Sequence, residues 1–299
     1  QPVADALKKR AGHPFYGYTH ATEELTAVLR KRLQEKYRWT VEAEWIIWLP
    51  GLVSGINIAC RTAGKAGDEV LAHIPAYPPF LSAPDNAGRI CISVPMTMHD
   101  NRWNIDTCGM EQYITGRSRL FLFCSPHNPC GRLYSRKEIE SVVDMCTAHD
   151  LIICSDEIHC DLVLEKGRGH IPTATVSDNA ANRTITLMAP SKTYNIAGLG
   201  CSCAIIPNPG LRRRFSKAMA GIVPHVNLFG YTAALAAYER GDEWLKGLLA
   251  YLQRNRDCAV EKIGAIQGLS TVTPEATYLL WVNCKELGLD DPAAFFEEN

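Results

Sequence analysis

The sequence has little excess of either charge and no extended apolar segment. Its 31 Lys and Arg residues nearly balance 32 Asp and Glu residues, so the formal net charge is -1. This balance argues against a nucleic acid or an anionic membrane as a partner. No run approaches the roughly 20 apolar residues of a membrane-spanning helix. The N-terminal segment, which begins with Gln1 rather than Met, also lacks the apolar core of a signal peptide.

Internal repeats, low-complexity tracts and the common zinc-binding cysteine spacings are absent too. Twelve cysteines are many, but they are scattered, often inside apolar stretches such as those ending at Cys124 and Cys154. Buried thiols of this kind are typical of a reducing compartment, so we expect a cytoplasmic protein. We interpret Cys201 and Cys203 as two buried residues on one face of a strand rather than as a metal site.

What the sequence does contain is an alternation of strand-like and helix-like segments. Such alternation predicts an α/β fold with a mostly parallel central sheet and helices on both faces. The strands read as continuous apolar runs, which indicates burial on both sides. The predicted strands are Val70–Ile74, Ile90–Val94, Leu120–Cys124, Leu151–Ser155, Thr184–Met188 and Ser202–Ile206.

Several helices carry recognisable start signals. Thr22 is a candidate N-cap, and Ser135 begins a capping-box pattern that predicts a helix to about His149. Two long helical stretches are predicted over roughly 209–240 and 242–265, with a break at Gly241.

A final strand, Tyr278–Val282, begins a new unit after the long helices. We therefore divide the chain into an N-terminal arm (1–20), a large domain (21–258) and the start of a smaller C-terminal α/β domain (259–299).

Asp156 stands at the carboxyl end of a predicted strand, where ligands bind in open α/β sheets. Strand alternation puts Ile158 on the same face, so an acid could meet a ring nitrogen while Ile158 packs against the ring. Alone, Asp156 could equally cap a helix or face solvent. The Asp-Glu-Ile-His-Cys-Asp cluster could also bind a metal, although its spacing matches no metal-site motif.

Three other segments supply weaker signals, each with an ordinary structural explanation. Asn128 lies in an Asn-Pro-Cys-Gly turn after a strand, and its amide could donate to a ring oxygen. Tyr77 stands beside prolines, where its ring could stack on a ligand or simply pack. Gly51 precedes an apolar helical stretch whose free N–H groups suit a phosphate, but glycine-rich helix starts are common.

Lys192 completes the set, because a lysine in an apolar setting is rarely buried without a role. The order along the chain is a phosphate-binding helix start, a stacking Tyr, an Asn-Pro-x-Gly turn, a strand-end Asp and a Lys. Together these signals predict a site for pyridoxal 5'-phosphate, with Lys192 forming a Schiff base and Asp156 facing the pyridine nitrogen.

At these residues the chain resembles the fold-type I pyridoxal-phosphate enzymes of the class I/II aminotransferase group. Within that group it is most similar to the MalY/PatB-type cystathionine β-lyases, from Phe15-Tyr-Gly-Tyr18 to Tyr278-Leu-Leu-Trp281. The resemblance implies the fold of pyridoxal-phosphate-dependent transferases, a small amino-acid substrate, and a homodimer with its active site at the subunit interface.

The resemblance also implies residue roles. The catalytic residues would be Lys192 as Schiff base and proton shuttle, Asp156 paired with the pyridine nitrogen, and Tyr77 stacked on the ring. Tyr18 would reach the phosphate of the neighbouring subunit. The implied cofactor-binding residues are Tyr18, Gly51, Leu52, Val53, Tyr77, Asn128, Asp156, Ile158, His159, Ser191 and Lys192, with the amides at 51–53 and Ser191 on the phosphate.

Two departures favour the lyase branch over the aminotransferases. His159 stands where the aminotransferases have Tyr, and Gly200 where they have Arg. His159 could also be a buried core histidine, and we assign it no proton transfer. The chain contains no segment like the family's Phe-x-Arg-Leu-Asn, which clamps the substrate carboxylate, nor its Trp-Val-Ala-Asp-Met-Asp-like N-terminal segment. We therefore expect either a longer gene product or a fragment.

Three functions stay open at this point. The first is a carbon–sulfur β-lyase that cleaves cystathionine or a related thioether amino acid. The second is an aminotransferase with the same cofactor. The third is a protein of this fold that binds or regulates with little catalysis.

Overall fold

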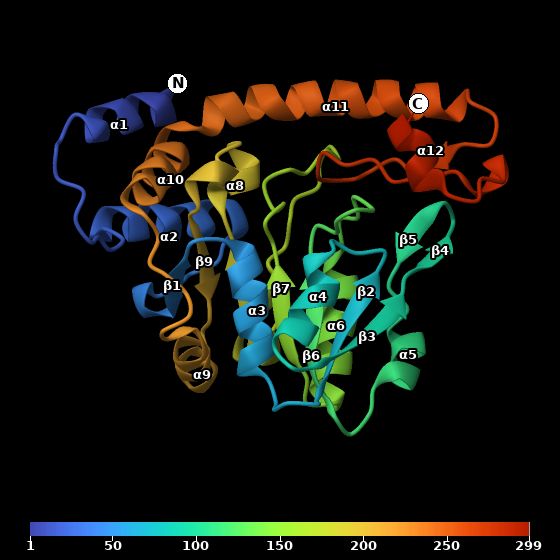
Figure 1. Cartoon of the computed structure of the whole chain (residues 1–299), viewed down its shortest axis with the longest axis horizontal. Helices are drawn as coiled ribbons and strands as arrows, with labels where there is room; N and C mark the ends of the chain where they lie inside the picture. Colours follow the sequence, from blue (N-terminus) through green and yellow to red (C-terminus); the bar gives the residue numbers. More distant parts are fainter. Residues whose placement is uncertain (299) are drawn as a thin grey trace.

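A seven-stranded sheet forms the centre of the computed structural model, which describes residues 1–298 (Figure 1). The strand order is β1-β9-β8-β7-β6-β2-β3, and neighbours are parallel except that β9 runs antiparallel to both β1 and β8. The α/β fold with a mostly parallel sheet is thereby confirmed. Its strands are β1 (Ile46–Leu49), β2 (Glu69–Ile74), β3 (Ile90–Pro95), β6 (Ser118–Cys124), β7 (Ile152–Asp156), β8 (Thr184–Met188) and β9 (Ser202–Ile205).

Helices cover both faces of this sheet, and α11 runs along one edge of the molecule (Figure 1). The predicted caps are confirmed: Thr22 accepts a hydrogen bond from the Leu25 amide, and Ser135 and Glu138 form a capping box. The helices are α1 (Pro2–Ala11), α2 (Glu23–Tyr37), α3 (Leu52–Thr62), α4 (Pro79–Asn86), α5 (Thr107–Met110), α6 (Arg136–Ala148), α7 (Asp178–Arg183), α8 (Pro190–Thr193), α9 (Pro209–Met219), α10 (Leu228–Arg240), α11 (Asp242–Gly264) and α12 (Pro292–Glu298).

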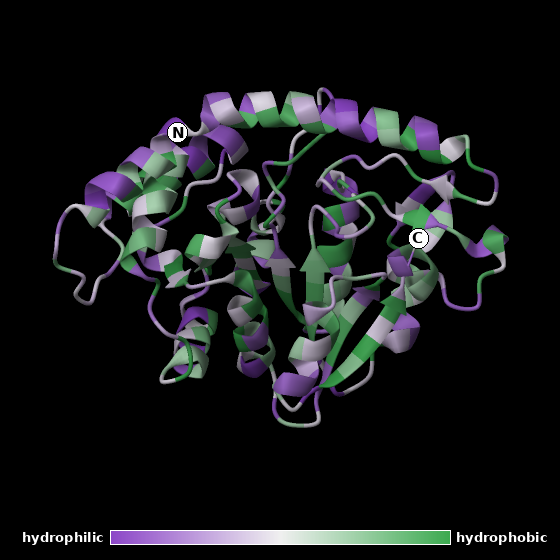
Figure 2. Ribbon diagram, turned by 45° about the horizontal axis from the view of Figure 1, so that its top comes forward, coloured by the Kyte–Doolittle hydropathy of each residue, from purple (hydrophilic) through white to green (hydrophobic). Residues whose placement is uncertain are grey.

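Strand β6 shows why the central strands lack an alternating pattern. Leu120 and Leu122 point into one core, together with α3, α4 and α9, whereas Phe121 and Phe123 point into the core beneath α6. A third core lies between α2, α10 and the β8–β9 end of the sheet. Because both faces are covered, the strands are apolar throughout, and Figure 2 shows this hydrophobic centre.

Two predictions about secondary structure are wrong. The stretch 209–240 is not one helix: α9 ends at Met219, and α10 starts at Leu228 with Asn227 as its N-cap. The reason is the intervening Gly221, which has φ +74°, and Pro224, which cannot donate to a helix. The second long stretch is confirmed as α11.

The strand expected at Tyr278–Val282 is replaced by a bend. Only Val282 is in a strand, β11 (Val282–Asn283), which pairs with β10 (Ser270–Thr271). The chain turns at Thr277, whose φ is +71° and whose amide donates to the Leu162 carbonyl. The boundary proposed at residue 258 falls inside α11 and stays a prediction.

Two further observations concern membrane-spanning helices and the cysteines. Within residues 1–298, no helix has the length and apolar character needed to cross a bilayer. Cys201 and Cys203 are buried in one core, as predicted, and all twelve cysteines are free thiols in this part of the chain. A short hairpin, β4 (Thr97–His99) and β5 (Arg102–Asn104), extends from the β3 edge.

Candidate active site

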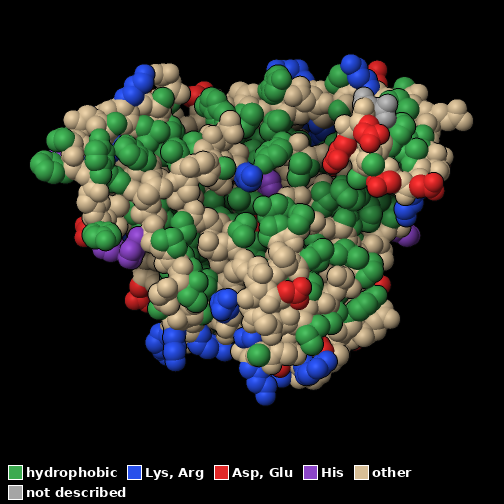
Figure 3. Space-filling model, viewed as in Figure 1, with side chains coloured by type: hydrophobic (Ala, Val, Ile, Leu, Met, Phe, Trp, Pro, Cys, Tyr) green, Lys and Arg blue, Asp and Glu red, His purple; other side chains and the backbone are tan. Residues whose placement is uncertain are grey.

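A pocket of about 440 Å³ lies at the carboxyl ends of the central parallel strands. Figure 3 shows a basic side chain beside a histidine in the middle of one face, with hydrophobic side chains around them. Every predicted site residue except Tyr18 lines this pocket: Gly51, Leu52, Val53, Tyr77, Asn128, Asp156, Ile158, His159, Ser191 and Lys192. Segments from five separate parts of the sequence therefore meet at one place.

Asp156 is the last residue of β7 and is almost completely buried. Within residues 1–298, the Ile158 amide is the one hydrogen-bond donor to its carboxylate, at 3.1 Å. Burial raises the pKa of the Asp156 carboxyl to about 7; the neighbouring Glu157 charge adds to this rise, and the Ile158 amide and Lys192 oppose it. Among the described residues this carboxylate forms no ion pair, and a protonated ring nitrogen would supply one.

His159 is buried beside it and is neutral near pH 7. Burial, together with the positive charge of Lys192, lowers the pKa of its imidazole to about 4. Its ring meets Tyr278 edge-on, with 5.6 Å between the ring centroids. Its Nδ1 atom has no hydrogen-bond partner among the described residues. His159 can therefore offer a neutral ring nitrogen to a bound molecule, but not a charge.

The start of α3 forms another wall of the pocket. Gly51 is the N-cap, and no side chain caps the helix there. The first backbone N–H groups of an α-helix lack partners within the helix, and the helix dipole favours an anion at this end. Gly51, Leu52 and Val53 all line the pocket, so these amides suit a phosphate group.

Lys192 enters the pocket from α8, together with Ser191. Gly200 also lines the pocket, and its backbone is in the left-handed region with φ +57°. A Cβ atom at this position would lie 2.9 Å from the Pro50 carbonyl oxygen. Any side chain at this position would therefore meet both a strained backbone conformation and a close contact.

Asn128 and Tyr77 follow β6 and β2. The Asn128 turn is closed by the Gly131 amide, which donates to the His127 carbonyl, and Gly131 has φ +66°. The backbone N–H of Asn128 donates to the Cys124 sulfur at 3.4 Å. Tyr77 lines the pocket and is exposed, so its ring is free to cover a flat ligand.

Tyr278 and Leu279 also line the pocket, although no sequence pattern predicted them as site residues. They follow the bend at Thr277, whose hydroxyl accepts the Leu279 amide. Just before this bend, Glu275 pairs with three arginines, Arg102, Arg132 and Arg168. The only signal in the sequence was an apolar run with a tyrosine, which is equally typical of a strand.

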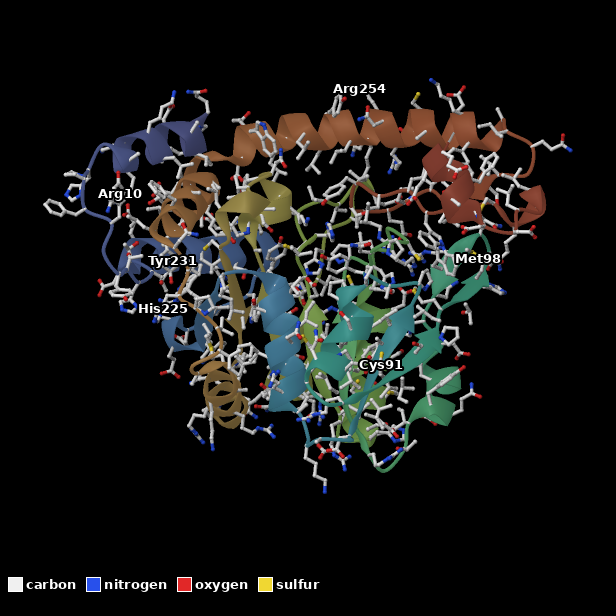
Figure 4. The ribbon with its side chains drawn as sticks, viewed as in Figure 1. Arg10, Cys91, Met98, His225, Tyr231 and Arg254 are labelled. Atoms are coloured by element: carbon white, nitrogen blue, oxygen red, sulfur yellow. The ribbon has the colours of Figure 1, made fainter. Side chains whose placement is uncertain are left out.

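Tyr18 lies away from the pocket and is fully exposed. It belongs to the segment after α1, where the Arg10 guanidinium donates to the carbonyls of His13 and Phe15; Figure 4 labels Arg10 beside this segment. The role that the resemblance gives Tyr18 concerns a neighbouring subunit, and it stays a prediction.

Taken together, the pocket fits pyridoxal 5'-phosphate. One end offers free helix amides for the phosphate, and the buried end offers Asp156, which forms no ion pair within residues 1–298. Lys192 lines the same pocket, and Tyr77 and Ile158 supply surfaces for a ring.

Comparison with known proteins gives the same picture. A family model described as "Aminotransferase class I and II" matches residues 2–297. Cystathionine beta-lyase PatB of Bacillus subtilis (strain 168) is 34% identical over 294 residues, which are 97% of this chain and 76% of that protein. The crystal structure of OvoB superposes with a TM-score of 0.97 at 46% identity, covering 99% of this chain and 78% of that one. Cystalysin from Treponema denticola, whose structure contains a pyridoxal 5'-phosphate cofactor, gives a TM-score of 0.94 at 32% identity, covering 99% and 75%.

Proposed function

Because this chain belongs to the class I and II aminotransferase family, we propose that it is a pyridoxal-phosphate-dependent carbon–sulfur β-lyase. Its substrate would be cystathionine or a related thioether amino acid, and its products a thiol, pyruvate and ammonia. The observation that carries the proposal is the pocket in which Lys192, Asp156 and His159 meet, in a chain similar to PatB and cystalysin. When bound, the cofactor withdraws electrons from the substrate α-carbon.

The residues of the pocket divide the work of holding the cofactor. The amides of Leu52 and Val53, with Ser191, would hold the phosphate, and Lys192 would bind the aldehyde group of the cofactor. Asp156 keeps the ring nitrogen protonated, since a cation at that place relieves the cost of its own buried charge. Asn128 donates to the ring oxygen.

Lys192 is also the base of the reaction. Its Nζ atom, when free, would take the proton from the substrate α-carbon. The carbon–sulfur bond at the β-carbon then breaks, and Lys192 is placed to return a proton to the departing sulfur. His159, which is neutral, adds no charge to this step. Tyr278 and Leu279 border the space for the distal part of the substrate.

The test is release of pyruvate and thiol from L-cystathionine by the protein carrying its bound cofactor. We expect equal amounts of both, and expect Lys192→Ala to abolish them together with the visible absorption of the lysine-bound cofactor. Lys246→Ala, which changes an exposed lysine on α11, is the matched control and should behave as wild type. No pyruvate, but a keto acid formed only when an amino acceptor is present, would identify an aminotransferase instead.

We also propose that the protein is a cytoplasmic homodimer. The exposed Phe15, Tyr16 and Tyr18 support an interface at the N-terminal segment. Co-refolding of a Lys192→Ala chain with a Tyr18→Ala chain tests it: recovery of activity requires that each site takes residues from both subunits. Activity that stays at the level of the separate variants would exclude a shared site.

A further inference from the structure

Lys192 lies on a helix too short to keep its own shape. Helix α8 is a single turn of four residues, closed by the Tyr194 amide, which donates to the Pro190 carbonyl at 2.9 Å. Isolated helices of this length are unstable in water. The direction of the Lys192 side chain must therefore come from contacts that the neighbouring residues make with the rest of the fold.

Those contacts lie on the side of α8 that faces away from the pocket. Thr193 is fully buried, and its hydroxyl donates to Oδ2 of Asp161 at 3.3 Å. The hydroxyl of Tyr194 donates to Oδ1 of Asp242 at 3.4 Å. The Arg32 guanidinium joins these two carboxylates, at 2.9 Å from Asp161 and 3.0 Å from Asp242. The two residues after Lys192 are thus tied to one bridging cation.

The cluster is itself well fixed. Asp161 also accepts hydrogen bonds from Lys36 at 3.0 Å and from the Tyr37 hydroxyl at 2.8 Å. The side chains of Asp161 and Arg32 are 7% and 8% exposed. The Arg32 guanidinium lies 5.5 Å from the centre of the Tyr194 ring, a cation–π distance. A buried cluster with so many donors on one carboxylate allows Thr193 little freedom.

Asp161 belongs to the same turn as Asp156. After β7 the chain is held by the Cys160 amide, which donates to the Glu157 carbonyl, and by the Leu162 amide, which donates to the His159 carbonyl. One rigid segment therefore presents Asp156 to the pocket on one side and Asp161 to Thr193 on the other.

We propose that Thr193 and Asp161 are positioning residues, which fix the direction of Lys192 relative to Asp156 through the contact between α8 and the turn after β7. The inference deepens the proposed function, on which it rests for the role of Lys192. Neither residue touches the pocket, so both act only through their neighbours.

The experiment compares two variants that each remove one hydroxyl donor to Asp161. Thr193→Val removes the donor on α8, and Tyr37→Phe removes the donor on α2, away from Lys192. For Thr193→Val we expect kcat on L-cystathionine to fall roughly 3- to 30-fold with little change in KM, because a small displacement of a reacting group is costly. We also expect faster loss of the cofactor on dilution. Thr193→Ser should restore both, and Tyr37→Phe should match wild type.

Two results would overturn the proposal: equal kcat and cofactor release in Thr193→Val and wild type, or equal losses in Thr193→Val and Tyr37→Phe. Hydrogen exchange of the Tyr194 and Ile196 amides tests the positioning role independently of the proposed lyase function. Even if the wild type cleaved no thioether, Thr193→Val should speed exchange at these amides, and Tyr37→Phe should not. Unchanged exchange would reject the positioning role on its own.

Discussion

Two aspartates only five residues apart in one turn have opposite electrostatic surroundings. Asp161 is buried, yet the charges of Arg32 and Lys36 overcome the effect of burial and lower the pKa of its carboxyl to about 2. Asp156 is buried too, but within residues 1–298 its carboxylate accepts one hydrogen bond, from the Ile158 amide, and burial raises the pKa of this carboxyl to about 7.

The difference separates a structural carboxylate from a functional one. Burying an unpaired charge is costly, and folds tolerate it where a ligand later supplies the partner. Asp161 has its partners inside the protein and connects α2, α8 and the turn after β7. Asp156 faces the pocket, where a cationic ring nitrogen fits. The following predictions test this division.

The largest effect should follow from removing the structural carboxylate. Asp161→Ala leaves Arg32 buried with its main partner missing, and such losses typically cost about 3–5 kcal/mol. Urea unfolding of the cofactor-free protein measures this cost. The control, Lys36→Ala, removes a partner whose side chain is 32% exposed and should cost less than about 1 kcal/mol. Similar costs for the two variants would contradict the assignment.

Asp156→Asn should have the opposite effect on stability and raise the free energy of unfolding of the cofactor-free protein. A carboxyl whose pKa is raised on folding stabilises the fold fully at low pH, and that contribution is lost as pH rises from about 4 to about 7. At pH 8 the folded protein bears the cost of a buried charge, which the neutral amide avoids. We expect Asp156→Asn to be more stable than wild type at pH 8 by about 2–4 kcal/mol.

The measurement for Asp156→Asn is urea unfolding of both proteins at several pH values. The gain should shrink steadily towards pH 4, and the variant should bind the cofactor more weakly than wild type at every pH. A gain that does not depend on pH would contradict the raised pKa of Asp156.

This contrast also explains what the sequence alone could predict. The apolar run of β7 and the acid at its end were visible, so Asp156 could be singled out. The pairing of Asp161 with Arg32 could not, because 129 positions separate the two residues and only the packing of α2 on the sheet brings them together. Local sequence patterns predict helices, strands and the residues at strand ends. Pairs between residues far apart in the sequence can be identified only once the fold is known.

Tyr278 was missed for a related reason. Its segment has the apolar character of a strand, but Thr277 adopts φ +71°, which is uncommon for a β-branched residue. The Leu162 carbonyl and the pairing of Glu275 with Arg132 support this conformation, and both are tertiary contacts. The break between α9 and α10 differs, because Pro224 was a visible signal that should have divided the predicted helix.

The smallest expected effect concerns His159. Burial lowers the pKa of its imidazole, whereas it raises the pKa of the Asp156 carboxyl. Burial disfavours the charged form of both groups, so the pKa of the acid rises to about 7 and that of the imidazole falls to about 4. In the cofactor-free protein, the NMR signal of the His159 ring should therefore stay constant from about pH 5.5 to pH 8. The same protein unfolded in urea is the control, where the ring should titrate near pH 6.5, the usual value for histidine. A midpoint above pH 5.5 in the folded protein would mean that water or a charge reaches His159. Burial would then no longer explain the pKa shifts of both Asp156 and His159.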